Sequence, residues 1–283
     1  MKYQIILFCF LAYFISWGSK FLISAADTGL LIHQIPKGLL ELIAQFGPTI
    51  AGIITIFVLS GRIGILGLIK NLSRFNIKIK WYLFALLFEL ILFIIIVLLI
   101  GPFMDINADK DSISWWQSIK NFLLNTIYLT LLTGLGEEIG WRGFLLPKLQ
   151  ACFPIIFSAI ILSIINSLWH LRTTDLIFIL NGNLTGFWHS FLPDMGLRFI
   201  ISTPVIFVIV YLFNKTKGSL IVMILFHGSS NASYEWVKDI TGVNDPSFIL
   251  PLFAGVLWLT SIFFVPALIK QGRKKEIVTS LTP

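Results

Sequence analysis

Long runs of apolar residues alternate with short polar segments along almost the whole chain. Eight of these runs approach the roughly 20 residues that an α-helix needs to cross the hydrocarbon core of a bilayer. They cover residues 3–23, 39–60, 81–101, 120–147, 154–171, 197–213, 218–235 and 248–269. The segment from Asn181 to Gly196, which contains glycines and Pro193, indicates a long polar loop. The pattern predicts an all-α membrane protein, a polytopic bundle of about eight transmembrane helices.

Three of these runs carry polar residues on a single helical face. These residues are Thr126, Thr130, Thr133, Glu137 and Trp141 on the fourth run, Ser163, Asn166, Ser167 and His170 on the fifth, and His227, Ser230, Asn231 and Tyr234 on the seventh. At about 100° per residue, spacings of three, four and seven residues keep each set within a narrow arc. Ionisable and amide side chains are costly inside a bilayer. We therefore expect the three stripes to face one buried polar cavity, which is a candidate functional site.

Composition supports the membrane prediction and excludes other classes. Of 283 residues, 57% are hydrophobic and 12% are charged, which is unlike a soluble globular domain. The basic residues gather in alternate loops and in the C-terminal tail, whereas most acids fall in the other loops, among them Asp105, Asp109, Asp175 and Asp194. The positive-inside rule then predicts one transmembrane domain over residues 1–283 with both termini in the cytoplasm. The net charge of +7 indicates topology and attraction to anionic lipid. No basic face alternates with exposed aromatic residues, so no nucleic-acid partner is expected.

The densest group of charges lies in the fourth run. Glu138 and Arg142 are four residues apart, in the order that favours an ion pair on one helix face. Glu137 points about 100° away, along the polar stripe, and has no cationic partner on its own helix. Glu138 and Arg142 are therefore predicted to have a structural, orienting role, and Glu137 is a candidate general base. In the alternative interpretation, all three charges only hold the helices together.

His170, His227 and Asn231 supply donors and a second base. A single histidine inside a membrane is also common as a hydrogen-bonded packing residue. Counted at about 1.5 Å per residue from the expected inner ends of the helices, all three and Glu137 lie in the middle of a core about 30 Å thick. Convergence of the four side chains is therefore allowed by their depth.

Three motifs in this order carry a family resemblance: Glu137-Glu138-x-x-x-Arg142 on one run, His170 on the next and His227-x-x-x-Asn231 on a later one. They resemble the CAAX protease and bacteriocin-processing family (CPBP, or Abi) of intramembrane endopeptidases, which includes the type II CAAX prenyl endopeptidases. The string EEIGWRGFLLPKLQ at residues 137–150, the string LWHL at 168–171 and the string FGP at 46–48 are similar to sequences of this family. The resemblance covers a motif-bearing core of about residues 40–235.

The resemblance implies an eight-helix fold and hydrolysis of a peptide bond in a membrane-associated substrate, such as a prenylated or leader peptide. It implies that Glu137 and His170 activate a water molecule and that His227 and Asn231 stabilise the tetrahedral oxyanion. Family members often have phenylalanine where this chain has Asn166. Asn166 shares a helix face with His170, and we expect it to orient the imidazole ring. The same departure also fits a member that no longer cleaves a substrate.

Several alternatives stay open at this stage. No metal is favoured as a cofactor, but Glu137, His170 and His227 are the set that would hold zinc with a water molecule in the fourth position. The chain contains no His-Glu-x-x-His string that would support this alternative. A non-catalytic bacteriocin immunity or partner-binding protein is a second candidate, and a transporter that uses Glu89 and Glu137 as a relay is a third. The Ile-, Phe-, Lys- and Asn-rich composition favours a bacterial plasma membrane, with a peptide or membrane-protein segment as the substrate.

Overall fold

In a computed structural model of the chain, the described residues are 2–31, 35–100, 114–241 and 249–281, without the side chains of residues 100, 115 and 273–281. Every regular element among them is helical. The α-helices are α1 (Lys2–Asp27), α2 (Lys37–Leu72), α3 (Ile79–Ile100), α4 (Trp115–Leu129), α5 (Leu135–Gly140), α6 (Leu146–Cys152), α7 (Ile155–Trp169), α8 (Thr173–Leu180), α9 (Leu184–Lys215), α10 (Leu220–Thr241) and α11 (Leu250–Leu281). Two π-helical segments, η2 (Thr130–Gly134) and η3 (Trp141–Leu145), flank α5. The predicted all-α class is confirmed.

A polytopic membrane protein is also confirmed, although a count of eight spans is not. Within the described residues, α1, α2, α3, α9 and α11 are long and apolar enough to cross a membrane. A sixth span results if α7 and α8, which are bent by 57° at their break, are taken together. The fourth apolar run is helical throughout, but the π-helical segments η2 and η3 separate α-helices of 15 residues or fewer. Helix α10 has 22 residues, but its second half carries Glu235, Lys238 and Asp239, which lower its hydropathy.

The outer surface of the bundle is apolar. Large side chains on several helices are widely exposed, including Phe14 at 67%, Leu98 at 71% and Phe263 at 76%. Apolar patches of this extent are unusual on soluble monomers. They are expected on helices that cross a bilayer, because the outer side chains of such helices contact apolar hydrocarbon and not water.

The segment 181–196 differs from the sequence-based prediction, because most of it is helical rather than a loop. Helix α9 begins at Leu184. The preceding residue, Asn183, is its N-cap: the side-chain oxygen of Asn183 accepts a hydrogen bond from the backbone N–H of Gly186 at 2.8 Å. This N-cap stabilises the first turn. Asp194 forms an ion pair within the helix: it lies 2.8 Å from Arg198, one turn along. The acidic segment with Asp105 and Asp109 lies outside the described residues.

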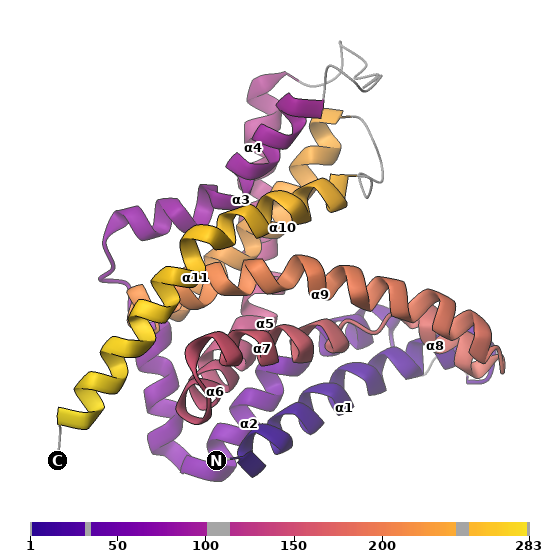
Figure 1. Cartoon of the computed structure of the whole chain (residues 1–283). Helices are drawn as coiled ribbons and strands as arrows, with labels where there is room; N and C mark the ends of the chain where they lie inside the picture. Colours follow the sequence, from indigo (N-terminus) through magenta and orange to yellow (C-terminus); the bar gives the residue numbers. More distant parts are fainter. Residues whose placement is uncertain (1, 32–34, 101–113, 242–248, 282–283) are drawn as a thin grey trace.

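The motif-bearing segment α5–η3–α6 lies at the centre of the molecule. Trp141, Leu145 and Leu146 are fully buried within the larger apolar core. Helix α5 packs against α2, and α10 packs against α3, α4 and η2 (Figure 1). A Cβ atom at Gly140 would come within 2.2 Å of the carbonyl oxygen of Pro48, so only glycine allows α5 to approach α2 this closely. The two adjacent glutamates are thereby held against several neighbouring helices.

Candidate active site

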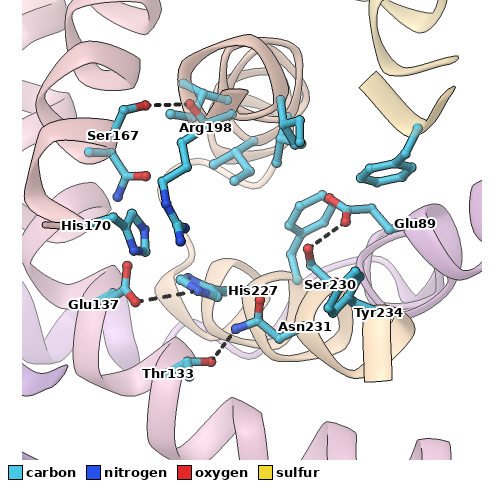
Figure 2. A pocket seen from close by; sticks show the side chains of 18 of the residues that line it. Glu89, Thr133, Glu137, Ser167, His170, Arg198, His227, Ser230, Asn231 and Tyr234 are labelled. Atoms are coloured by element: carbon cyan, nitrogen blue, oxygen red, sulfur yellow. Dashed lines mark hydrogen bonds and ion pairs between the residues drawn. The ribbon is translucent and has the colours of Figure 1, made fainter. Parts of the chain in front are cut away.

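Residues from all three polar stripes line one cavity of about 490 Å³, although four stripe residues do not: Thr126, Thr130, Trp141 and Ser163. Its polar lining includes Gln45, Glu89, Thr133, Glu137, Asn166, Ser167, His170, Arg198, His227, Ser230 and Asn231. Figure 2 shows Glu137, His170, His227 and Asn231 around this space, presented by α5, the end of α7, and α10. The structure therefore brings together the four side chains that the sequence suggests as catalytic.

Glu137 is held by two hydrogen bonds and is almost completely buried. Its Oε1 accepts from Nε2 of Gln45 at 2.9 Å, and its Oε2 accepts from the indole Nε1 of Trp141 at 3.2 Å. Only 3% of the residue is exposed. An ionised carboxylate offers about four lone-pair positions. Two positions therefore remain for a ligand or a water molecule in the cavity.

Glu138 forms the second layer of the site. Its Oε1 lies 2.6 Å from a terminal nitrogen of Arg142 and 2.7 Å from Nδ1 of His227. Glu138 has no exposed surface and Arg142 is 3% exposed. The pair predicted from the i, i+4 spacing is thus present, and it also fixes the orientation of the His227 ring. The other ring nitrogen of His227, Nε2, lies 3.8 Å from Oε1 of Glu137.

The π-helical segment η2 positions the amide of Asn231. The side-chain nitrogen of Asn231 donates to Oγ1 of Thr133 at 2.9 Å, and this hydroxyl donates to the carbonyl oxygen of Leu129 at 2.8 Å. A Cβ atom at Gly228 would lie 2.2 Å from Oγ1 of Thr130, so α10 and η2 are in close contact. Single π-turns within α-helices are frequent at functional sites. One amide N–H and the carbonyl oxygen of Asn231 remain for a ligand.

His170 lies immediately after α7 and is only partly buried. Its ring packs edge-on against Trp169, with ring centroids 4.8 Å apart. The indole of Trp169 donates to Oγ of Ser16 at 2.8 Å, which secures this turn against α1. Within the described part of the chain, no hydrogen bond joins the side chains of His170 and Asn166. Asn166 lines the same cavity, and its orienting role stays a prediction.

Gln45 and Arg198 line the cavity but were not among the candidates from the sequence. Gln45 precedes the Phe-Gly-Pro string on α2, and its polarity within an apolar run was the available signal. Arg198 comes from α9, and its side chain is 38% exposed. Figure 2 shows Arg198 extending toward Glu137, His170 and His227. The i, i+4 spacing of Asp194 and Arg198 could have indicated a helix, but the glycines and Pro193 nearby favoured a loop.

The donor set does not fit a three-ligand metal site. Among the residues that the structure describes, no group of three His, Cys, Asp or Glu side chains is placed to hold a metal ion. Glu137, His170 and His227 line the same cavity but are not placed as a three-ligand set.

Comparisons with known proteins agree with the motifs. A family model described as type II CAAX prenyl endopeptidase Rce1-like matches residues 119–233. The resemblance to this family is confirmed. CAAX prenyl protease 2 of Methanococcus maripaludis is 29% identical over 203 residues, which are 69% of this chain and 70% of that relative. The region that matches the Rce1-like family contains Glu137, His170, His227 and Asn231. The two matches support an intramembrane protease.

Proposed function

We propose that the protein is an intramembrane endopeptidase in which Glu137 and His170 activate the attacking water. The observation that carries this proposal is the convergence of Glu137, His170, His227 and Asn231 on one cavity among apolar helices. Glu137 retains free lone-pair positions, and the ring of His170 has no hydrogen-bond partner among the described side chains. A water molecule between them could donate one hydrogen to Glu137 and the other to a ring nitrogen of His170, which places a base within hydrogen-bond reach of the proton to be taken.

In the proposed reaction, Glu137 takes one proton from this water while a ring nitrogen of His170 accepts a hydrogen bond from the other O–H. The resulting hydroxide adds to the carbonyl carbon of the scissile peptide bond. The carbonyl oxygen becomes an oxyanion, which accepts hydrogen bonds from the Asn231 amide and from Nε2–H of His227. The C–N bond then breaks while the proton on Glu137 passes to the leaving amine. The products are a carboxylic acid and an amine, and Glu137 returns to its ionised form.

The role of His227 depends on its protonation. Nδ1 faces the Glu138 carboxylate, which is an acceptor paired with Arg142, so Nδ1 must carry a hydrogen. Nε2 can donate to an oxyanion only when the ring carries a second proton. Glu137 and Glu138, on either side of the ring, would balance the charge of this imidazolium.

Replacing Asn231 with alanine is expected to lower kcat by about 10²- to 10³-fold, because one preorganised donor to the oxyanion is lost. KM should change little, since the donor matters most in the transition state. Thr133→Val is the matched control: it removes the hydroxyl that positions the amide without removing the amide itself. Its loss in kcat should be clearly smaller than that of Asn231→Ala, and an equal loss would argue for a packing role of Asn231.

Exhaustive chelation of the purified protein is expected to leave peptide cleavage unchanged. Among the residues that the structure describes, no three His, Cys, Asp or Glu side chains are placed to bind a metal ion. The proposed chemistry uses side chains alone. Cleavage rates before and after chelation, and after addition of zinc, are the measurement. Loss of activity that zinc restores would contradict a metal-free mechanism.

Comparative proteomics tests the function itself. Membrane fractions from cells that carry the wild type or Glu137→Ala are compared for peptides with new ends. A membrane-associated peptide cut only in the wild type would support the endopeptidase and identify its substrate. Identical peptide sets, together with an unchanged biological effect of Glu137→Ala, would instead favour a protein that binds a partner without cleaving it.

A further inference from the structure

Glu89 on α3 lines the same cavity but has no part in the proposed reaction. Its Oε2 accepts from Oγ of Ser230 at 2.6 Å. Its Oε1 is buried and has no hydrogen-bond partner in the described chain, and only 5% of the residue is exposed. Leaving a buried acceptor without a donor is unfavourable, and more so within a membrane. Such an atom at a cavity wall indicates that a ligand supplies the donor.

The surroundings of Glu89 define the shape of that ligand. Phe93, Tyr234 and Phe253 line this end of the cavity. The rings of Phe93 and Phe253 stack with centroids 4.1 Å apart, and those of Phe93 and Tyr234 are 6.3 Å apart. An aromatic wall beside a carboxyl group suits a side chain with a long apolar stem and a hydrogen-bond donor at its end.

This end of the cavity adjoins the proposed oxyanion donors. Ser230 directly precedes Asn231 and follows His227 by three residues, which corresponds to about 1.5 and 4.5 Å along the helix axis. An extended peptide advances about 3.3 Å per residue. A substrate side chain that reaches Glu89 therefore belongs to a residue one or two positions from the scissile bond. In Figure 2, Glu89 lies on the opposite side of His227 from His170.

Charge favours a basic side chain at Glu89. Arg198, at the other end of the cavity near His170, is already paired with Asp194 at 2.8 Å. At Glu89 a basic group gains a charge-assisted hydrogen bond, which is roughly twice as strong as a neutral one. An acidic side chain would be repelled there, and a purely apolar one would leave Oε1 without a donor.

We propose that Glu89, with Ser230 and the ring cluster of Phe93, Tyr234 and Phe253, forms a specificity subsite for a lysine or arginine side chain of the peptide substrate. The inference rests on the proposed endopeptidase function. It predicts substrates with a basic residue beside the cleaved bond, within an otherwise apolar sequence.

Peptide binding to the full-length protein tests this subsite. The probes are N-acetyl-Leu-Lys-Leu amide and its norleucine counterpart, which differ in the terminal ammonium group. Their Kd values are measured in nanodiscs with Glu137→Gln, which prevents cleavage. The lysine peptide is expected to bind about tenfold more tightly, and adding Glu89→Gln should reduce this ratio to less than about twofold. Glutamine keeps an oxygen that can accept from Ser230, so the helix contact is preserved.

Glu41→Gln is the matched control, because Glu41 is an exposed acid on α2 and should leave the ratio unchanged. Glu89→Asp, which withdraws the carboxylate by one methylene, gives a second variant that should weaken the preference. Equal binding of the two peptides by the parent protein, or a ratio that survives Glu89→Gln, would overturn the subsite. If the lysine peptide binds more tightly but the wild-type protein, which keeps Glu137, cleaves no peptide, the proposed function would be overturned instead of the subsite.

Discussion

Replacing Glu137 with glutamine is expected to lower kcat/KM for peptide cleavage by about 10³-fold or more. General-base catalysis contributes about 10² to 10⁴ in rate, and an amide cannot accept the proton of water. Glutamine has nearly the same shape and keeps one acceptor for the Gln45 and Trp141 donors. The measurement is the cleavage rate of a peptide identified by proteomics, with purified protein in nanodiscs.

The control for this variant is its thermal unfolding midpoint, which should stay within a few degrees of the wild type. Exposed Glu41 again offers a matched substitution, and Glu41→Gln should keep full activity. If Glu137→Gln folds normally and retains more than about a tenth of the wild-type rate, another group must be the base. His170 would then be the first candidate, since it lines the same cavity.

Replacing Arg142 with methionine is expected to reduce the free energy of unfolding by about 3–5 kcal/mol. The change leaves Glu138, which has no exposed surface, without the arginine that lies 2.6 Å from its carboxylate, although the His227 ring still contacts the same oxygen at 2.7 Å. Breaking a buried pair from one side costs far more than the pair contributes, because a buried charge then loses a main part of its compensation in an apolar interior. Unfolding in mixed micelles, monitored by tryptophan fluorescence, gives the measurement.

Two further variants separate this effect from lost packing. Adding Glu138→Gln to Arg142→Met removes the uncompensated charge and should recover about half of the lost free energy or more. Lys37→Met breaks the exposed pair of Lys37 and Asp27, whose side chains are 49% and 33% exposed, and should leave the free energy of unfolding almost unchanged, because solvent screens such pairs. A loss below about 1 kcal/mol for Arg142→Met would mean that water reaches the Glu138 carboxylate.

The pairing of Glu138 with Arg142 and the separate direction of Glu137 could be predicted from the sequence. Both depend only on the angle of about 100° between successive residues of a helix. The three polar stripes were visible for the same reason. Polar side chains are costly in contact with lipid, so stripes within a bilayer should face a shared interior. The presence of Glu137, His170, His227 and Asn231 in one cavity could therefore also be expected.

The partners of these residues required the tertiary structure. Gln45 is 92 residues from Glu137, and Glu138 is 89 residues from His227. No periodicity within one helix specifies which atom of a distant helix comes within 3 Å. The π-helical turn at Thr133 likewise lies where η2 and α10 are in close contact, which no pattern within one helix predicts.

The start of α9 shows the same division between local and tertiary information. Glycines and Pro193 are turn-forming residues by local preference, so the sequence around them favoured a loop. The cap at Asn183 and the ion pair of Asp194 with Arg198 make the segment helical and bring Arg198 to the cavity. By itself, the sequence determined the membrane class, the polar faces and the local ion pair, because these follow from composition and helical repeat. Only the tertiary structure decided which side chains meet across helices, because such contacts depend on how the helices pack together.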